Sequence, residues 1–376
     1  MLEENQEKDK IDWSILDTIS ASKQSAALRA FNVAVLVQEF LSMLKTRERD
    51  ILTARFGLEN GQGETLENIG KKLDLTRERV RQIEKETFRR INQSSLSPSI
   101  QAGIELIFQV IEDRGKIARE NLILDAVLLN NDTEIARQGV LFVLKIIPRF
   151  FLLKENALYH QGWYVAGFDK DIFQKVIDLA RDILKSAGQP LSQDRLFGEI
   201  RKQSHEPDIA KFSDAATESY LAVSKAMDRN PYQLWGLGEW PQIHPKDMGD
   251  KAYLVLLHHK IPEHYGKITE LINKQSFDRR IAHKETVHNE LIKDKRFVLI
   301  GRGIYALKEW GYKEGVVADV IAQALHAAAR PLSKEEIIDE VMKQRKVKRN
   351  TVIVALSNRK RFQKTPEGKY TEKQNV

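Results

Sequence analysis

The stretch LTRERVRQIEKETFRRI, residues 75–91, combines six basic and three acidic side chains with apolar residues at regular intervals. Thr76 can cap a helix that starts after it, because a threonine hydroxyl accepts a hydrogen bond from a free backbone N–H of the first turn. In that helix the inner face would consist of Val80, Ile83, Thr87 or Phe88, and Ile91. The outward face would carry Arg77, Glu78, Arg81, Gln82, Lys85 and Arg89. The pattern therefore predicts an amphipathic helix with one packed face and one strongly polar face.

A shorter helix precedes this one. Thr65 can cap it, Gly70 lets a second helix cross closely, and Asp74 is a residue type that tolerates the tight turn between the two. Two helices joined by a turn of three or four residues are the helix-turn-helix arrangement. Residues 24–58 indicate two more helices, the second with Thr46 as its cap and Gly57 as its stop. We therefore predict one helical module over residues 24–93.

The side chains at the start of the 75–91 helix are types that recognise DNA bases. Arginine bonds guanine, glutamate accepts from the cytosine amino group, and glutamine pairs with adenine. The candidate base contacts are Arg77, Glu78, Arg81 and Gln82. The candidate phosphate contacts are Lys71, Lys72, Lys85, Arg89 and Arg90. From composition alone, a surface helix stabilised by neighbours such as Glu78 with Gln82 and Arg81 with Lys85 is an equally good interpretation.

The segment from Leu44 to Asn92, LKTRERDILTARFGL…ETLENIGKKLDLTRERVRQIEKETFRRI, closely resembles region 4 of bacterial sigma-70-type sigma factors. The resemblance covers about 50 residues and includes both subparts in order. It implies that the second helix binds the −35 promoter element and that the region docks on the flap of the RNA polymerase β subunit. By matching positions, it implies base contacts for Arg77, Glu78 and Gln82, and base or phosphate contact for Arg81.

The resemblance leaves two questions to the structure. Apolar residues around Ile51 and Phe56 would either face polymerase or pack inside the module, and we favour packing. A complete sigma factor also has an upstream domain that captures the melted −10 strand with a basic, aromatic-rich helix. Only about 40 residues precede the match, with Trp13, Phe31 and Phe40 as their aromatics. We therefore do not expect this chain to melt a promoter by itself.

A second pattern recurs after the linker at residues 93–99. Two aromatic residues stand eight positions apart in four apparent hairpins, each after a helical stretch: Phe151/Tyr159, Tyr232/Trp240, Phe297/Tyr305 and Phe362/Tyr370. In the last three, a glycine stands two residues before the second aromatic and permits a hairpin turn. The segments 188–200 and 329–341 share a Pro-Leu-Ser start 141 residues apart, and Ser333 with Glu336 can form a capping box.

Small helices followed by a hairpin describe a winged helix. We predict four winged-helix-like modules, at residues 100–168, 172–244, 250–312 and 316–372; the alternative is a chance recurrence of aromatic pairs in unrelated hairpins. The stretches YGKITELINK…ETVHNELIKDKRFVLIGRGIYALKEWG and RPLSKEEIIDEVMKQRKVKRNTVIVALSNRKRFQKTPEGKY are similar to the HARE-type winged-helix domain. That domain also occurs in the delta subunit of bacterial RNA polymerase.

The last module is the most basic. Residues 343–369 hold ten Lys and Arg but only one acidic residue, Glu367. In a winged helix, phosphate contacts would come from the start of the third helix and from the approach to the wing: Lys346, Lys348, Arg349, Arg359, Lys360 and Arg361. The alternatives are a solvated basic tail or a surface for an acidic partner protein.

The rest of the chain limits the function. Its 376 residues carry a net charge of +7, contain no cysteine, and begin with residues 1–23 that we expect to be disordered and to contain no signal sequence or membrane span. His283 and His288 are five apart, off the spacing of two ligands on one helix face, and GRGIYA (301–306) lies in an expected wing. No P-loop or nucleophile pair is visible. We predict no catalytic residue, no cofactor and no metal.

We therefore expect a mainly α protein: a sigma region-4-like helix-turn-helix followed by tandem winged-helix (α+β) modules. The expected function is that of a cytoplasmic, nucleoid-associated transcription regulator, whose partner is double-stranded DNA. The alternatives are an accessory protein of RNA polymerase, docked on the core and its β flap with DNA contact secondary, and a DNA-targeting subunit of a modification or restriction system.

Overall fold

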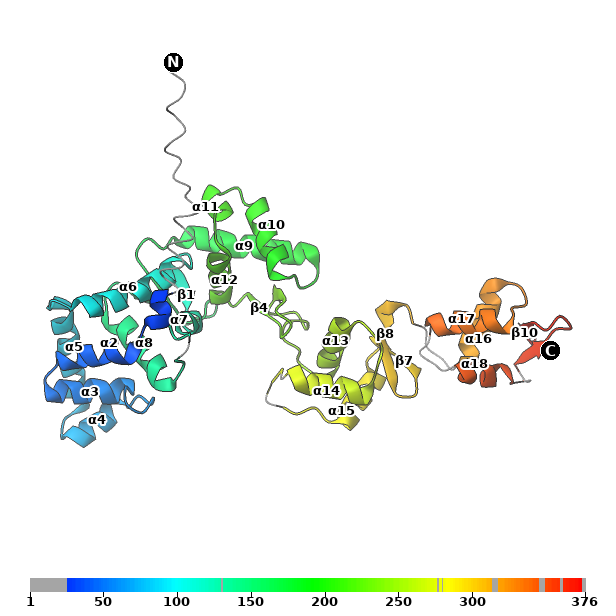
Figure 1. Cartoon of the computed structure of the whole chain (residues 1–376), viewed down its shortest axis with the longest axis horizontal. Coiled ribbons are helices and arrows are strands. Elements are labelled where there is room, and N and C mark those ends of the chain that lie inside the picture. The colour runs from blue at the N-terminus through cyan, green and yellow to red at the C-terminus, as the bar shows by residue number, and fades with distance from the viewer. Residues whose placement is uncertain are drawn as a thin grey trace, which may run out of the picture. The chain divides into compact units, whose positions relative to one another are not determined.

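The computed structural model describes residues 26–129, 131–275, 277–278, 280–312, 317–344, 349–358 and 361–373. The expected disordered segment at residues 1–23 lies outside this description. The chain divides into two compact units, Met1–Asp228 and Arg229–Val376, which we treat one at a time. Both consist of helices with small antiparallel sheets, as Figure 1 shows. This confirms the predicted mainly α fold class, and the small antiparallel sheets fit winged-helix modules. No described helix has the length and apolar character needed to cross a membrane.

The N-terminal unit opens with a helical turn at residues 26–30. The elements that follow are α2 (Val33–Ser42), α3 (Thr46–Phe56), α4 (Leu66–Leu73), α5 (Arg77–Gln93), α6 (Pro98–Glu112), β1 (Ile117–Arg119), α7 (Glu120–Val127), α8 (Glu134–Ile146), β2 (Phe151–Leu153), β3 (Gly162–Tyr164), α9 (Lys170–Ala187), α10 (Gln193–Gln203), α11 (Pro207–Ala210) and α12 (Asp214–Val223). The strand β4 (Met227–Arg229) lies at the division between the units and pairs with β5 (Trp235–Leu237).

The helix boundaries follow local chemistry. Thr65 and Thr76 cap α4 and α5 as predicted, each hydroxyl accepting a backbone N–H at 3.2 Å. Gly57 ends α3 in the left-handed conformation with φ of 65°, and Asp74 turns the chain between α4 and α5 with φ of 58°. The predicted cap at Thr46 is wrong by one residue. The Glu48 carboxylate accepts the backbone N–H of Lys45 at 3.0 Å, so Lys45 takes the cap position and Thr46 becomes the first helical residue.

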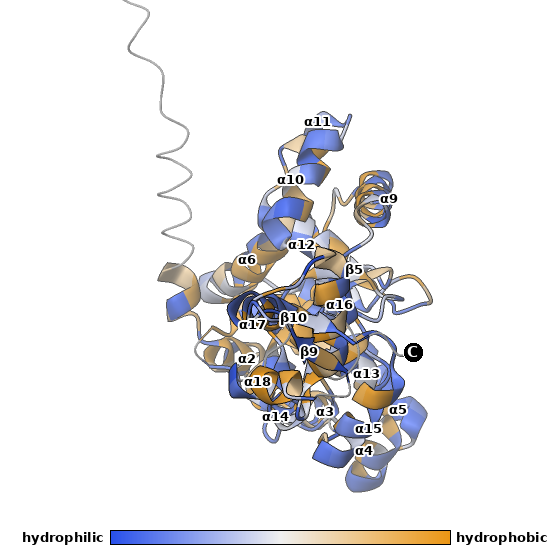
Figure 2. Ribbon diagram, turned by 90° about the vertical axis from the view of Figure 1, so that its right-hand side faces the viewer, coloured by the Kyte–Doolittle hydropathy of each residue, from blue (hydrophilic) through white to orange (hydrophobic). Residues whose placement is uncertain are grey.

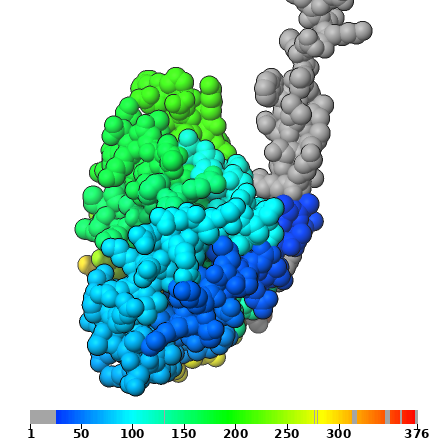
Figure 3. Space-filling view, turned by 90° about the vertical axis from the view of Figure 1, so that its left-hand side faces the viewer, coloured from blue at the N-terminus to red at the C-terminus, as the bar shows by residue number. Residues whose placement is uncertain are grey.

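Helices α2 and α3 and the end of α5 share one hydrophobic core with α6, α7 and α8, whereas the start of α5 packs in a separate cluster with α3 and α4. At its centre, the Phe142 ring of α8 lies 5.1 Å from Phe56 of α3 and 6.0 Å from Phe40 of α2, both edge to face. Gly139 lets α8 approach α2, since an added Cβ would lie 3.1 Å from the side chains of Val33 and Val37. In Figure 3 the blue surface of residues 26 onward runs without a break into the cyan surface that follows. The expected division between residues 93 and 100 thus falls inside one core.

The aromatic pairs predicted for the first two modules do not form hairpins. In the sheet with strand order β1-β3-β2, Phe151 pairs with Tyr164, whereas Tyr159 lies in the loop and bridges to Ser224. The Asn156 side chain accepts the backbone N–H groups of residues 158 and 159, which makes this loop longer than predicted.

The second predicted hairpin is displaced for a similar reason. The Asn230 side chain accepts the backbone N–H groups of Tyr232 and Leu234, which places Tyr232 in the turn between β4 and β5. Trp240 lies beyond β5, outside the strands. Both misplacements arise because an asparagine side chain can organise a turn by itself, so the spacing of the aromatic residues does not set the register.

The C-terminal unit contains two arrangements of three helices and a hairpin, each with its own core. The first has α13 (Met248–His259), β6 (Glu263–His264), α14 (Tyr265–Gln275), α15 (Lys284–Lys293), β7 (Phe297–Gly301), β8 (Ile304–Leu307) and the 3-10 turn η1 (Lys308–Trp310). The second has α16 (Val317–Ala328), α17 (Lys334–Gln344), α18 (Arg349–Leu356), β9 (Phe362–Lys364) and β10 (Tyr370–Glu372). These arrangements fit winged helices.

The last two aromatic pairs do lie on hairpins. Tyr305 pairs with Leu299 across β7 and β8, and Tyr370 pairs with Lys364 across β9 and β10. The predicted capping box is also present: the Ser333 hydroxyl accepts the backbone N–H of Glu336 at 3.2 Å, and the Glu336 carboxylate accepts that of Ser333 at 2.7 Å. Hydrogen bonds from Arg330 and from Ser333 lower the pKa of Glu336 to about 2, so this cap is charged at neutral pH.

Candidate nucleic-acid interface

Helix α5 is held by its inner face. Val80 is fully buried against Ile51 of α3 and Ile69 of α4. Gly70 makes the close crossing possible, because a Cβ there would lie 2.5 Å from the carbonyl oxygen of Leu75. Ile91, at the other end of the helix, joins the core shared with α8. The predicted apolar face of this helix is confirmed.

The predicted base contacts all point outward. Arg77, Glu78, Arg81 and Gln82 are exposed and occupy the first two turns of α5. In known helix-turn-helix proteins, the corresponding end of the second helix enters the major groove. Arg79 is exposed beside them and donates to the Gln82 side chain at 3.4 Å, a neighbour that the sequence interpretation did not single out. Its sequence signals were its residue type and its place on the polar side of the helix.

These side chains bond one another. The Arg81 guanidinium donates twice to the Glu78 carboxylate, at 2.8 and 2.6 Å, and Gln82 donates to the same carboxylate at 3.5 Å. The hydrogen bond from Arg81 keeps the pKa of Glu78 below its ordinary value. Both partners of this ion pair are more than half exposed, so solvent screens their attraction and the pair contributes little to stability. The Arg77 guanidinium makes no hydrogen bond or ion pair with any described residue.

The predicted phosphate contacts fall into three groups. Lys71 and Lys72 of α4 pair with Glu67 at 3.1 Å and Glu64 at 2.7 Å. Lys85 and Arg89 are exposed on α5, with no acidic partner in the described parts of the chain. Arg90 is different, because its guanidinium binds the mostly buried Glu48 carboxylate with both nitrogens. This ion pair joins α5 to α3, and phosphate contact by Arg90 stays a prediction.

The suggested polymerase-facing residues of α3 are buried. Ile51 is 0% exposed and Phe56 is 7% exposed, within the cores described above. Packing inside the fold, the interpretation we favoured, is therefore confirmed. Phe56 contacts the ring of Phe88 on α5 and the ring of Phe142 on α8, so part of this packing is supplied from outside the helix-turn-helix.

Two of the predicted phosphate contacts of the last module can be placed. Arg349 is the first residue of α18, with Nη2 3.3 Å from Oε1 of Glu335. Arg361 stands just before β9, with Nη1 2.7 Å from Oδ1 of Asp319. Lys346, Lys348, Arg359 and Lys360 lie outside the described residues.

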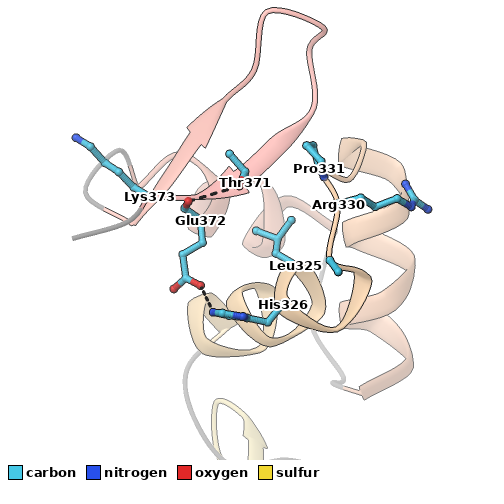
Figure 4. Close-up of a pocket in the computed structure, with 8 residues that line it drawn as sticks. Leu325, His326, Arg330, Pro331, Thr371, Glu372 and Lys373 are labelled. Carbon is cyan, nitrogen blue, oxygen red and sulfur yellow. Dashed lines mark hydrogen bonds and ion pairs between the residues drawn. The ribbon is translucent and has the colours of Figure 1, made fainter. Parts of the chain in front are cut away.

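An open pocket of about 580 Å³ also lies in the last module, between α16 and β10. Figure 4 shows His326 directed at Glu372, with Nε2 3.2 Å from the carboxylate, and Arg330 on the rim. Arg330 in turn pairs with Glu336 at 2.9 Å. Three polar side chains of this pocket, His326, Glu372 and Arg330, thus find partners within the chain. Over the part of the chain that the structure describes, no three His, Cys, Asp or Glu residues are grouped as metal ligands.

Comparison with known proteins finds matches to the helix-turn-helix segment. Residues 40–93 match the family model for sigma-70, region 4. RNA polymerase sigma factor SigA of Clostridium acetobutylicum is 38% identical over 84 residues, 22% of each chain. SigA1 of Synechococcus elongatus is 51% identical over 51 residues, 14% of this chain and 13% of its own. RNA polymerase sigma-C factor of Nostoc sp. is 47% identical over 57 residues, 15% and 14% respectively. This chain thus spans about a fifth or less of these relatives and carries a sigma-70 region 4 module.

Proposed function

We propose that this protein regulates transcription by binding duplex DNA through α5, at promoter elements of the −35 type. Arg77, Glu78, Arg81 and Gln82 contact bases, while Lys71, Lys72, Lys85 and Arg89 contact phosphates. The last module adds phosphate contacts through Arg349, Arg361 and the basic residues around them. The winged-helix modules, which we assign to the HARE type at residues 250–312 and 316–372, contact DNA or RNA polymerase.

One observation carries this proposal. The four side chains that can recognise bases share the exposed first two turns of α5, inside the segment that matches sigma-70 region 4. A helix that only faces solvent would not need arginine, glutamate and glutamine together on its first two turns. The ion pair between Glu78 and Arg81 does not oppose DNA binding, because an exposed pair is weak enough to exchange for a base contact worth about 1–3 kcal/mol.

The test is the double substitution Arg77→Ala with Gln82→Ala in the full chain. Loss of two base contacts is expected to weaken binding to a preferred duplex by about 30-fold or more, and binding to random duplex far less. The matched control is Arg29→Ala with Gln38→Ala, which removes the same two residue types from exposed positions on the first helical turn and α2. Retention of sequence-selective binding by the Arg77/Gln82 variant would show that α5 does not read bases.

The accessory role at RNA polymerase is favoured by a separate observation on charge. Residues 100–168 hold seven basic and eight acidic residues, and residues 172–244 hold nine and ten. Modules without excess positive charge are poor general ligands for DNA. If polymerase core captures both the wild-type chain and the Arg77/Gln82 variant while all DNA binding is weak and nonselective, the accessory role replaces the one proposed.

A further inference from the structure

Helix α18 of the last module presents an outward face without charge. Val352 and Leu356 point inward and are buried with Ile321 and Ile338. Asn350, Thr351 and Val354 are exposed at spacings of three and four residues, so they form one outward face. Val354 is 72% exposed, among the highest values for a large apolar side chain in the described chain.

This face interrupts the most basic stretch of the protein. Residues 350–358 contain no charged residue, although residues 343–369 contain ten Lys and Arg. Figure 2 shows the apolar character of α18 in orange. Exposing a branched apolar side chain to water carries an unfavourable free energy, which contact with another apolar group removes. A helix with basic flanks and an uncharged face has the chemistry of a surface that binds a polyanion and then contacts its uncharged parts.

We propose that α18 is a second base-reading helix, selective for thymine and adenine in the major groove. The Val354 side chain and the Thr351 methyl group contact thymine 5-methyl groups, and the Asn350 amide pairs with adenine N6 and N7. This inference rests on the proposed function only in requiring that the last module bind duplex DNA, and it does not depend on α5.

Charge favours DNA over a protein as the occupant of this face. Residues 316–372 hold twelve basic and seven acidic residues, an excess that attracts phosphates. Arg349 stands at the start of α18, and Lys364 is exposed on β9 of the hairpin that follows. The major groove is wide enough for one α-helix, and the thymine methyl is its apolar group. An uncharged face between cationic elements complements that groove.

The first experiment selects preferred duplexes from a random pool with the full chain. The wild-type chain is expected to enrich two elements: one lost in the Arg77→Ala/Gln82→Ala variant, and a second, rich in A·T pairs, lost in an Asn350→Ala/Val354→Ala variant. Failure of the first element would count against the proposed function, and failure of the second against this inference. Val35→Ala, at an exposed valine of α2 (51% exposed), should leave both elements intact.

The second experiment replaces single thymines of the second element with deoxyuridine, which lacks only the methyl group. Removal of the contacted methyl is expected to weaken wild-type binding about fourfold. The Val354→Ala chain should bind both duplexes equally, about fourfold more weakly than wild type binds thymine. Alanine at an exposed helical position favours the fold, so loss of structure would not explain this result.

Two results would overturn the inference. If the Asn350→Ala/Val354→Ala variant binds every sequence more weakly by the same factor, the helix contacts phosphates without reading bases. If that variant keeps the A·T-rich element and wild type ignores deoxyuridine, the face does not touch DNA; a protein partner is then the remaining occupant.

Discussion

Replacing Phe142 with alanine tests whether the helix-turn-helix and the α6–α8 helices are one cooperative body. Phe142 is 0% exposed and forms edge-to-face pairs with Phe40 and Phe56. Truncation of a buried phenylalanine to alanine costs about 3–5 kcal/mol, a range that covers the lost ring pairs. We expect a loss of about 4 kcal/mol, or roughly a thousandfold shift in the unfolding equilibrium.

Amide hydrogen exchange can follow this loss on both sides of the core. Val140 reports on α8 and Val80 reports on α5, whose local cluster does not include Phe142. If the helix-turn-helix and α6–α8 unfold as one cooperative unit, the amides of Val140 and Val80 lose protection by similar factors. Phe151→Ala is the control, because that ring is 42% exposed and its truncation should cost about 1 kcal/mol or less. Loss of protection at Val140 with full protection at Val80 would refute the shared-core argument.

Three further predictions concern the helix-turn-helix. Gly70→Ala should destabilise the module by about 1–3 kcal/mol and weaken DNA binding, because the added Cβ would meet the Leu75 carbonyl oxygen. The control is Gly198→Ala, whose Cβ meets nothing within 4 Å and which should stabilise α10 by about 0.5–1 kcal/mol. Urea unfolding measures both changes. Glu48 has a pKa held low by Arg90, so its stabilisation is present above the ordinary carboxyl pKa and lost as pH falls through the folded value. The urea midpoint of wild type should therefore exceed that of Glu48→Gln near neutral pH and converge with it in acid, whereas Glu59→Gln, at an exposed position, should leave the midpoint near that of wild type. Lys85→Ala should weaken DNA binding equally for all sequences and reduce the slope of log K against log salt by about 0.9, with Lys211→Ala unchanged.

Local features of this fold follow from the sequence. Threonine caps at Thr65 and Thr76, the capping box at Ser333 and the left-handed turn at Asp74 depend on residues within a few positions of one another. The apolar spacing of α5 identified its inner face for the same reason. The outward position of the candidate base contacts then follows from helical geometry alone.

Long-range contacts could not be predicted in this way. Arg90 and Glu48 are 42 positions apart, and nothing local shows that one arginine of the RR pair in α5 turns inward while Arg89 stays exposed. The burial of Phe56 depends on a ring from α8. In the first two modules, asparagine side chains set the turns, so aromatic spacing gave the wrong strands.

Genome-wide mapping of bound DNA can show whether α5 directs this protein to promoters, when cells that contain the wild-type chain are compared with cells that contain the Arg77→Ala/Gln82→Ala variant. We expect wild-type sites centred on −35-like elements upstream of transcription starts, and loss of those sites in the variant. Sites scattered without regard to promoters, or promoter sites that persist unchanged in the variant, would contradict it.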